Sequence, residues 1–90
     1  MKDLRVLLVD DYSSIRTLLR VVLEDEGYRT SEASNATEAI EAVLKTKPDL
    51  IILDLMMPQI DGRYVIEHLR QSGNKTPIIV LTAKTEGLDA

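Results

Sequence analysis

Hydrophobic and polar positions follow two different periods along the chain. Three short runs are apolar almost throughout, which is typical of strands buried on both faces of a sheet, and a fourth run alternates weakly. Between these runs, apolar residues recur at the spacing of an amphipathic helix. The predicted strands cover residues 4–9, 28–33, 49–55 and 76–82. The predicted helices end near Gly27, Pro48 and Gly73, and their apolar faces contain Ile15, Leu18, Leu19, Val22 and Leu23, then Ala36, Ala39, Ile40, Val43 and Leu44, then Val65, Ile66 and Leu69.

Short polar residues stand where the first two helices begin. Ser13 or Ser14 is predicted to cap the first helix, because their side chains can accept a hydrogen bond from a free backbone N–H. Ser34 or Asn35 is predicted to cap the second helix. Glu38, three residues after Asn35, has the position of the acidic partner in a capping box.

The order of these elements predicts the fold class. Strands that alternate with helices form a parallel sheet with right-handed crossovers and helices on both faces. We therefore expect an α/β, doubly wound parallel sheet. In the flavodoxin-like arrangement of such sheets, the first and third strands are neighbours at the point where ligands bind.

Polar residues that could bind a metal ion or react follow three of the predicted strands. Asp10 and Asp11 end the first strand, Asp54 ends the third, and Thr82 ends the fourth, so we expect them at one edge of the sheet. Clustered carboxylates repel one another, and a hard cation such as Mg²⁺ offsets that repulsion. An acidic pocket that holds Mg²⁺ can admit a phosphoryl group, and a carboxylate can then attack it. Asp54 is the candidate nucleophile, because it stands alone on the central strand.

Composition narrows the choice of class. The chain has 90 residues, enough for one domain, with 44% hydrophobic and 29% charged residues, as in ordinary globular proteins. A net charge of −4 argues against binding nucleic acid through this segment. The absence of cysteine excludes disulfides and thiolate metal sites. No apolar run is long enough to span a membrane, and the acidic end of the first run differs from a signal peptide, so we expect a cytoplasmic protein.

Three stretches together resemble a known family. They are LLVDD at 7–11, LIILDLMMPQIDG at 50–62 and PIIVLTA at 77–83. In this order and spacing they resemble the receiver domain of two-component response regulators, the CheY-like family, over essentially the whole chain. Each motif alone is weak, because acid-ended strands are common.

The resemblance implies a role for each acid. It makes Asp54 the phosphoacceptor, which takes its phosphoryl group from the phosphohistidine of a sensor histidine kinase. It makes Asp11 a direct Mg²⁺ ligand and Asp10 a ligand that acts largely through water. Asp54 and the backbone carbonyl of Met56 complete the implied set of Mg²⁺ ligands.

The resemblance also implies roles for residues near the acids. Thr82 is similar to the switch hydroxyl that turns toward the phosphoryl group, and Ala83 to the small residue that leaves room for it. Pro58 and the Asp61–Gly62 pair match the loop that shapes the rim of the site.

The family pattern continues beyond this sequence. Family members add a fourth helix, a fifth strand that carries an aromatic switch residue and ends near a phosphoryl-binding lysine, and a fifth helix. Lys84 follows Thr82 too closely to be that lysine. We therefore expect residues 1–90 to form a receiver domain that is incomplete at its C-terminus, with strand order 2-1-3-4. Such a chain is expected to be a fragment, to be loosely packed, or to form a homodimer through its exposed fourth strand or by exchanging elements.

Two functions are open on these grounds. The first is a signalling switch that accepts a phosphoryl group on Asp54, with at most self-phosphorylation and autodephosphorylation as its chemistry. The second is a phosphorylation-incompetent receiver fragment that acts as a dimerisation or assembly module. A phosphohydrolase is disfavoured, because such enzymes usually place a second acid two residues after the nucleophile, where this chain has Met56.

The remaining polar residues are interpreted as surface residues. His68, the single histidine, lies in the charged segment EHLRQ and is expected to be solvated. Tyr12 either screens the mouth of the acidic site or covers the first helix. The basic residues expected on solvated helix faces are Arg16, Arg20, Lys45, Lys47 and Arg70.

Overall fold

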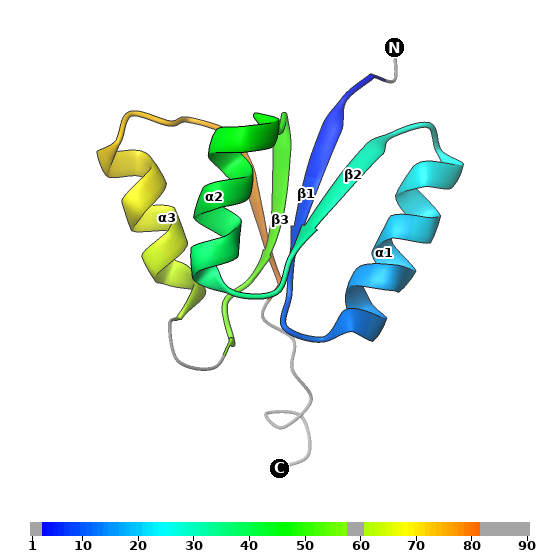
Figure 1. Cartoon of the computed structure of the whole chain (residues 1–90), viewed down its shortest axis with the longest axis horizontal. Coiled ribbons are helices and arrows are strands. Elements are labelled where there is room, and N and C mark those ends of the chain that lie inside the picture. Colours follow the sequence, from blue (N-terminus) through cyan, green and yellow to red (C-terminus); the bar gives the residue numbers. More distant parts are fainter. Residues whose placement is uncertain (1–2, 58–60, 82–90) are drawn as a thin grey trace.

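The computed structural model describes residues 3–57 and 61–81 of the chain. Four strands alternate with three helices in this part of the chain (Figure 1). The strands are β1 (Arg5–Val9), β2 (Arg29–Ala33), β3 (Leu50–Asp54) and β4 (Ile78–Leu81). The helices are α1 (Ser13–Asp25), α2 (Ala36–Thr46) and α3 (Gly62–Gln71). All seven predicted elements are therefore present.

The four strands form one parallel sheet in the order β2-β1-β3-β4. At its carboxyl edge, Val9 of β1 pairs with Ala33 of β2 and with Leu53 of β3. The predicted doubly wound fold and the order 2-1-3-4 are both confirmed. Because β1 and β3 are neighbours, the residues that follow Val9 and Leu53 lie next to each other.

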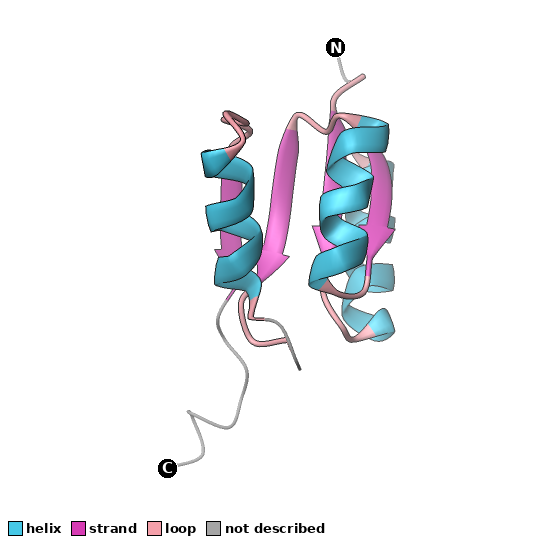
Figure 2. Cartoon of the chain, turned by 60° about the vertical axis from the view of Figure 1, so that its left-hand side comes forward, coloured by secondary structure: helices cyan, strands magenta, loops and turns pink. Residues whose placement is uncertain are grey.

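The helices cover both faces of the sheet. Helices α2 and α3 lie on one face and α1 lies on the other (Figure 2). The main core lies between the sheet and the α2–α3 layer, where alternate strand residues meet both helices. Its buried members are Leu7, Val9, Ala33, Ala36, Ala39, Val43, Ile51, Leu53, Met57, Val65 and Leu69.

The α1 face is less completely covered. Val6 and Leu8 of β1 are buried, but α1 itself has no buried residue. Three of its apolar side chains, Leu18, Val21 and Val22, are more than half exposed. Helix α1 therefore has more apolar side chains on its apolar face than it buries against the sheet. Within the described residues, none of the helices is long and apolar enough to cross a membrane.

The start of α2 confirms its capping prediction. Asn35 caps α2 by accepting a hydrogen bond at Oδ1 from the Glu38 N–H at 2.8 Å. The Glu38 carboxylate reaches back to Ser34 and accepts from both its N–H and its hydroxyl, each at 2.8 Å. Both bonds lower the pKa of Glu38 below its usual value, and the bond from the Ser34 backbone N–H contributes most.

The predicted cap of α1 is wrong. Its N-cap residue is Tyr12, which makes no side-chain cap bond, while Ser13 is already helical. Tyr12 is more than half exposed, and its backbone carbonyl accepts from the N–H groups of Ile15 and Arg16, both at 3.2 Å. The helix thus begins one residue after the acid pair, and the side chain of its N-cap residue makes no capping bond.

Candidate metal and phosphoryl site

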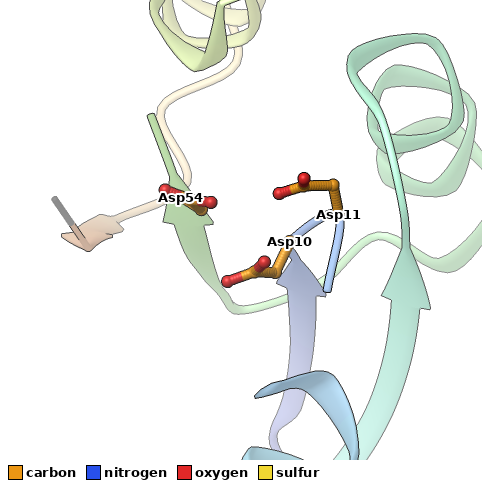
Figure 3. Close-up of side chains that lie close together, drawn as sticks. All are labelled: Asp10, Asp11 and Asp54. Carbon is orange, nitrogen blue, oxygen red and sulfur yellow. The ribbon is translucent and has the colours of Figure 1, made fainter. Parts of the chain in front are cut away.

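Three aspartates meet at the carboxyl edge of the sheet. Asp10 and Asp11 follow β1, and Asp54 is the last residue of the neighbouring strand β3. One carboxylate oxygen from each lies within 4.8 Å of the others. Figure 3 shows them at the tips of the two strands, with the carboxylate of Asp11 directed toward Asp54. The structure thus brings together the three acids that the sequence pattern singled out.

Asp10 is held firmly in this position. It is 4% exposed, and its backbone N–H donates to the carbonyl oxygen of Ala33 at 3.1 Å. Its Oδ1 atom accepts from the N–H of Tyr12 at 2.9 Å. The carboxylate therefore closes the turn that leads from β1 into α1, and this turn fixes the direction in which the side chain points.

Asp54 is fixed by the same kind of turn. It is 1% exposed, and its Oδ1 atom accepts from the N–H of Met56 at 2.9 Å. The next residue, Leu55, donates its N–H to the carbonyl oxygen of Leu81 at 3.2 Å, which continues the pairing with β4. Two buried carboxylates, on adjacent strands, thus each close a turn onto the amide two residues later.

Gly62 allows α3 to begin against the backbone of the Asp54 segment. A Cβ atom at this position would lie 2.6 Å from the Asp54 carbonyl oxygen and 2.8 Å from the Leu55 Cα, both far inside contact distance. The Gly62 N–H donates to the Leu55 carbonyl oxygen at 3.1 Å, and Asp61 caps the helix by accepting from the Arg63 N–H at 2.8 Å. The Asp61–Gly62 pair is thus a helix start, with glycine required for close approach rather than for a turn.

The donor set fits a hard divalent cation. Carboxylate oxygens are the ligands that Mg²⁺ prefers, at about 2.0–2.1 Å in an octahedron whose opposite ligands are therefore about 4 Å apart. The three aspartate oxygens lie within 4.8 Å of one another, close enough to be ligands of one ion whose other positions water molecules can fill. Three like charges this close destabilise one another, and a cation among them removes that repulsion.

Comparisons with known proteins assign the chain to a family. The sequence model of the response regulator receiver domain matches residues 6–90. The chain belongs to this family. The resemblance carried by the three sequence motifs is therefore confirmed, and the acidic edge is the edge of a receiver domain.

Relatives and solved structures agree with this assignment. This receiver domain is 50% identical over 84 residues to the transcriptional regulatory protein ResD of Bacillus subtilis and 47% identical over 85 residues to the alkaline phosphatase synthesis transcriptional regulatory protein PhoP of the same species. These matches cover 93% and 94% of this chain, respectively. The chain spans only 35% of the length of either relative.

Two solved structures extend the agreement to three dimensions. The chemotaxis response regulator CheY4 of Vibrio cholerae superposes with a TM-score of 0.85 at 33% identity, over 98% of this chain and 75% of its own. The response regulator TrrA of Thermotoga maritima, solved in complex with Mg²⁺–BeF, superposes with a TM-score of 0.83 at 41% identity, over 96% of this chain and 73% of its own.

One residue of the receiver domain differs from its sequence-based interpretation. Arg16 was expected on a solvated helix face, but its side chain is only 16% exposed. Its guanidinium donates to the carbonyl oxygen of Asp10 at 2.6 Å and to Glu32 at 2.9 Å. Helix periodicity alone cannot reveal these contacts, because they depend on which part of β2 lies beside the end of β1.

The other basic residues agree better with the expectation. Lys45, Lys47 and Arg70 are exposed, and Arg70 also donates to the carbonyl oxygens that follow α3. The Arg20 side chain is 39% exposed and pairs with Glu24 and Glu32. His68 is exposed and lies beside Tyr64, with ring centroids 6.0 Å apart, which confirms its interpretation as a surface residue.

Several predicted site residues lie outside the described part of the chain. Thr82, Ala83 and Pro58 are among them. Met56 lies within the described residues. Its side chain is half exposed, and its backbone N–H donates to Asp54 Oδ1. The neighbouring Met57 is buried in the main core, as a packing residue.

Proposed function

We propose that this receiver domain is a signalling switch that accepts a phosphoryl group on Asp54, in the presence of Mg²⁺, from the phosphohistidine of a sensor histidine kinase. The observation that supports this most strongly is the convergence of Asp10, Asp11 and Asp54 within 4.8 Å at the strand ends. Clustered buried carboxylates are costly for a fold, and their expected use is to hold a cation that brings in an anionic substrate.

Each acid has a distinct part in the proposal. Asp11 binds Mg²⁺ directly, Asp10 acts largely through water, and Asp54 and the backbone carbonyl of Met56 complete the ligand set. When bound, Mg²⁺ neutralises charge on the phosphoryl oxygens. The turns closed by the Tyr12 and Met56 amides keep two of the carboxylates pointing in fixed directions, which reduces the reorganisation needed for reaction.

The chemical step is a transfer between two nucleophiles. A carboxylate oxygen of Asp54 attacks phosphorus, and the new O–P bond forms as the P–N bond of the phosphohistidine breaks. The electron pair of that bond stays on the imidazole nitrogen, so no other reactant is required. Thr82 is proposed as the hydroxyl that turns toward the phosphoryl group, and Ala83 as the residue that leaves room for it.

Intact-mass measurement tests the proposal. The chain is incubated with acetyl phosphate and Mg²⁺, with a parallel sample in EDTA. We expect one added phosphoryl group with Mg²⁺ and none in EDTA. The Asp54→Asn variant keeps the shape of the side chain but lacks the nucleophilic carboxylate, so it should gain no mass. Equal labelling of that variant would show that the nucleophile is another residue.

The edge strand favours a second candidate function. In the part of the chain that the structure describes, strand β4 is at the edge of the sheet, and its Ile79 side chain is 49% exposed. A strand edge with apolar side chains can pair with another chain, as in a dimerisation or assembly module. Unchanged mass with acetyl phosphate, together with a concentration-dependent dimer in sedimentation, would favour this candidate. The sensor kinase as partner and the cytoplasm as location remain predictions.

A further inference from the structure

We infer that Arg16 is a positioning residue for the metal site: its guanidinium fixes the Asp10–Asp11 segment so that both carboxylates face Asp54. The inference rests on the proposed function, because the site it concerns is the Mg²⁺ site of that reaction. It assigns a role in phosphoryl acceptance to a side chain of α1 that lies outside the acid cluster.

Arg16 connects three elements through one side chain. Its Nη1 atom donates to the Asp10 carbonyl oxygen at 2.6 Å, just beyond the end of β1. Its Nε atom donates to Glu32 Oε1 at 2.9 Å, on the neighbouring strand β2. A planar guanidinium holds these donors in a fixed fork, so the position of one acceptor determines the position of the other. The position of the end of β1 is thereby fixed relative to β2.

The acceptor on β2 is itself fixed. Glu32 receives Arg16 at Oε1 and Arg20 Nε at Oε2, the latter at 3.2 Å. Arg20 also lies 3.7 Å from Glu24, one helical turn later on α1. The carboxylate that anchors Arg16 is therefore held from both sides, which makes it a firm reference point for the guanidinium.

The contact with Asp10 lies where the acid pair needs restraint. The Asp10 N–H is already bound to the Ala33 carbonyl, so the two backbone polar groups of Asp10 are both tied to the β2 side of the sheet. Repulsion among the three acids favours a less ordered arrangement of this segment when no cation is present. The Arg16 contact fixes the Asp10 backbone relative to β2, so the segment has fewer conformations to lose when the cation binds.

Charge alone predicts the opposite effect. A guanidinium near the site repels Mg²⁺, so removing its charge should tighten Mg²⁺ binding if Arg16 acted only through its charge. A positioning role predicts weaker binding when Arg16 is removed, because the ligands must then be ordered on binding. The direction of the change in affinity therefore separates the two explanations.

The chain offers a matched control for the test. Arg29 lies at the opposite end of β2 from the acids, where its side chain is 67% exposed and pairs with Asp3 at 3.9 Å. Its removal takes away the same charge and leaves the Arg16–Glu32 contact in place. Mg²⁺ dissociation constants are measured by calorimetry for the unmodified chain and for the Arg16→Ala, Arg16→Lys and Arg29→Ala variants. We expect Arg16→Ala to weaken binding about tenfold, as for partners that orient metal ligands. Arg29→Ala should change it less than about twofold.

The lysine variant and a metal-free readout complete the design. Arg16→Lys keeps the charge but replaces the fork by a single nitrogen, so it should weaken binding in the same direction as Arg16→Ala. In EDTA, hydrogen exchange at the Tyr12 amide, which closes the Asp10 turn, should be faster in Arg16→Ala and unchanged in Arg29→Ala.

The outcomes distinguish this inference from the proposed function. If the unmodified chain binds no Mg²⁺, the proposed function fails, and the exchange rates in EDTA still decide whether Arg16 positions the segment. If the unmodified chain binds Mg²⁺ and Arg16→Ala binds it equally or more tightly, the positioning role is overturned and the proposed function stands. If Arg16→Ala does not fold, Arg16→Lys decides: an unchanged affinity overturns the inference, and a weakened one supports it.

Discussion

The core beneath α2 and α3 and the carboxyl edge of the sheet bury side chains to the same depth for opposite reasons. Leu53 is fully buried among apolar side chains, and the next residue, Asp54, is 1% exposed beside two other acids. Burial of Leu53 stabilises the fold whether or not a cation is present. Burial of Asp54 among like charges is unfavourable until a cation is present. Adjacent residues of one strand thus serve different purposes: Leu53 stabilises the fold, and Asp54 belongs to the candidate cation site.

The largest expected effect concerns the core. Leu53→Ala removes a fully buried side chain and should lower the free energy of unfolding by about 2–5 kcal/mol, equally in EDTA and in Mg²⁺. Leu44→Ala makes the same change on α2, where the side chain is 73% exposed, and should cost less than about 0.5 kcal/mol. Urea denaturation measures both. A loss for Leu53→Ala that depended on Mg²⁺ would mean that the two regions are coupled.

The next effect concerns the place where the two regions meet. Gly62→Ala puts a Cβ against the backbone of Asp54 and Leu55, so it should cost about 1–3 kcal/mol and also weaken Mg²⁺ binding by displacing that backbone. Gly73→Ala is the control. At Gly73 φ is +88° and no atom lies near the added Cβ, so alanine there should cost about 1–2 kcal/mol from backbone strain alone.

Measured together, these glycine variants show whether close approach at α3 matters for the site. We expect both to lower the midpoint of urea denaturation and only Gly62→Ala to change the dissociation constant for Mg²⁺. Normal Mg²⁺ affinity in a folded Gly62→Ala chain would indicate that α3 can move away without disturbing Asp54.

The strands of the core and the acids at the carboxyl edge were both predictable from the sequence. The strands were predictable because a strand buried on both faces is apolar throughout, as in residues 50–53. The meeting of Asp10, Asp11 and Asp54 followed from the parallel sheet, whose strands end at one edge. The strand pattern and the parallel sheet that it predicts were therefore enough to place the three candidate acids together.

Features that depend on the pairing of distant segments were missed. Arg16 has the sequence signature of a surface residue, and its role follows from the register that places Glu32 beside Leu8, two residues before Asp10. Gly62 follows aspartate in a pair typical of turns, and its steric role is visible only once α3 lies against β3. The start of α1 was misplaced because Ser13 is a strong capping residue, whereas the acid pair already fixes the turn through the Tyr12 amide.

The smallest expected effect concerns the charge of the site. Asp11→Asn removes one of three clustered charges and should raise the free energy of unfolding in EDTA by about 1 kcal/mol. With saturating Mg²⁺ the order should reverse, since the unmodified chain gains more from binding the cation. Glu41→Gln removes the same charge from an exposed site on α2 and should leave both conditions nearly unchanged. Thermal unfolding with and without Mg²⁺ measures the reversal.

The most direct test of the cation site is a Mg²⁺ titration followed by NMR through the backbone amide signals of the labelled chain. If the three aspartates bind one ion, we expect saturable shifts at Asp10, Asp11, Tyr12 and Met56, and unchanged signals for the core residues of α2. Shifts that do not saturate, or that are as large in the core as at the carboxyl edge, would contradict the claim that the three aspartates form one cation site.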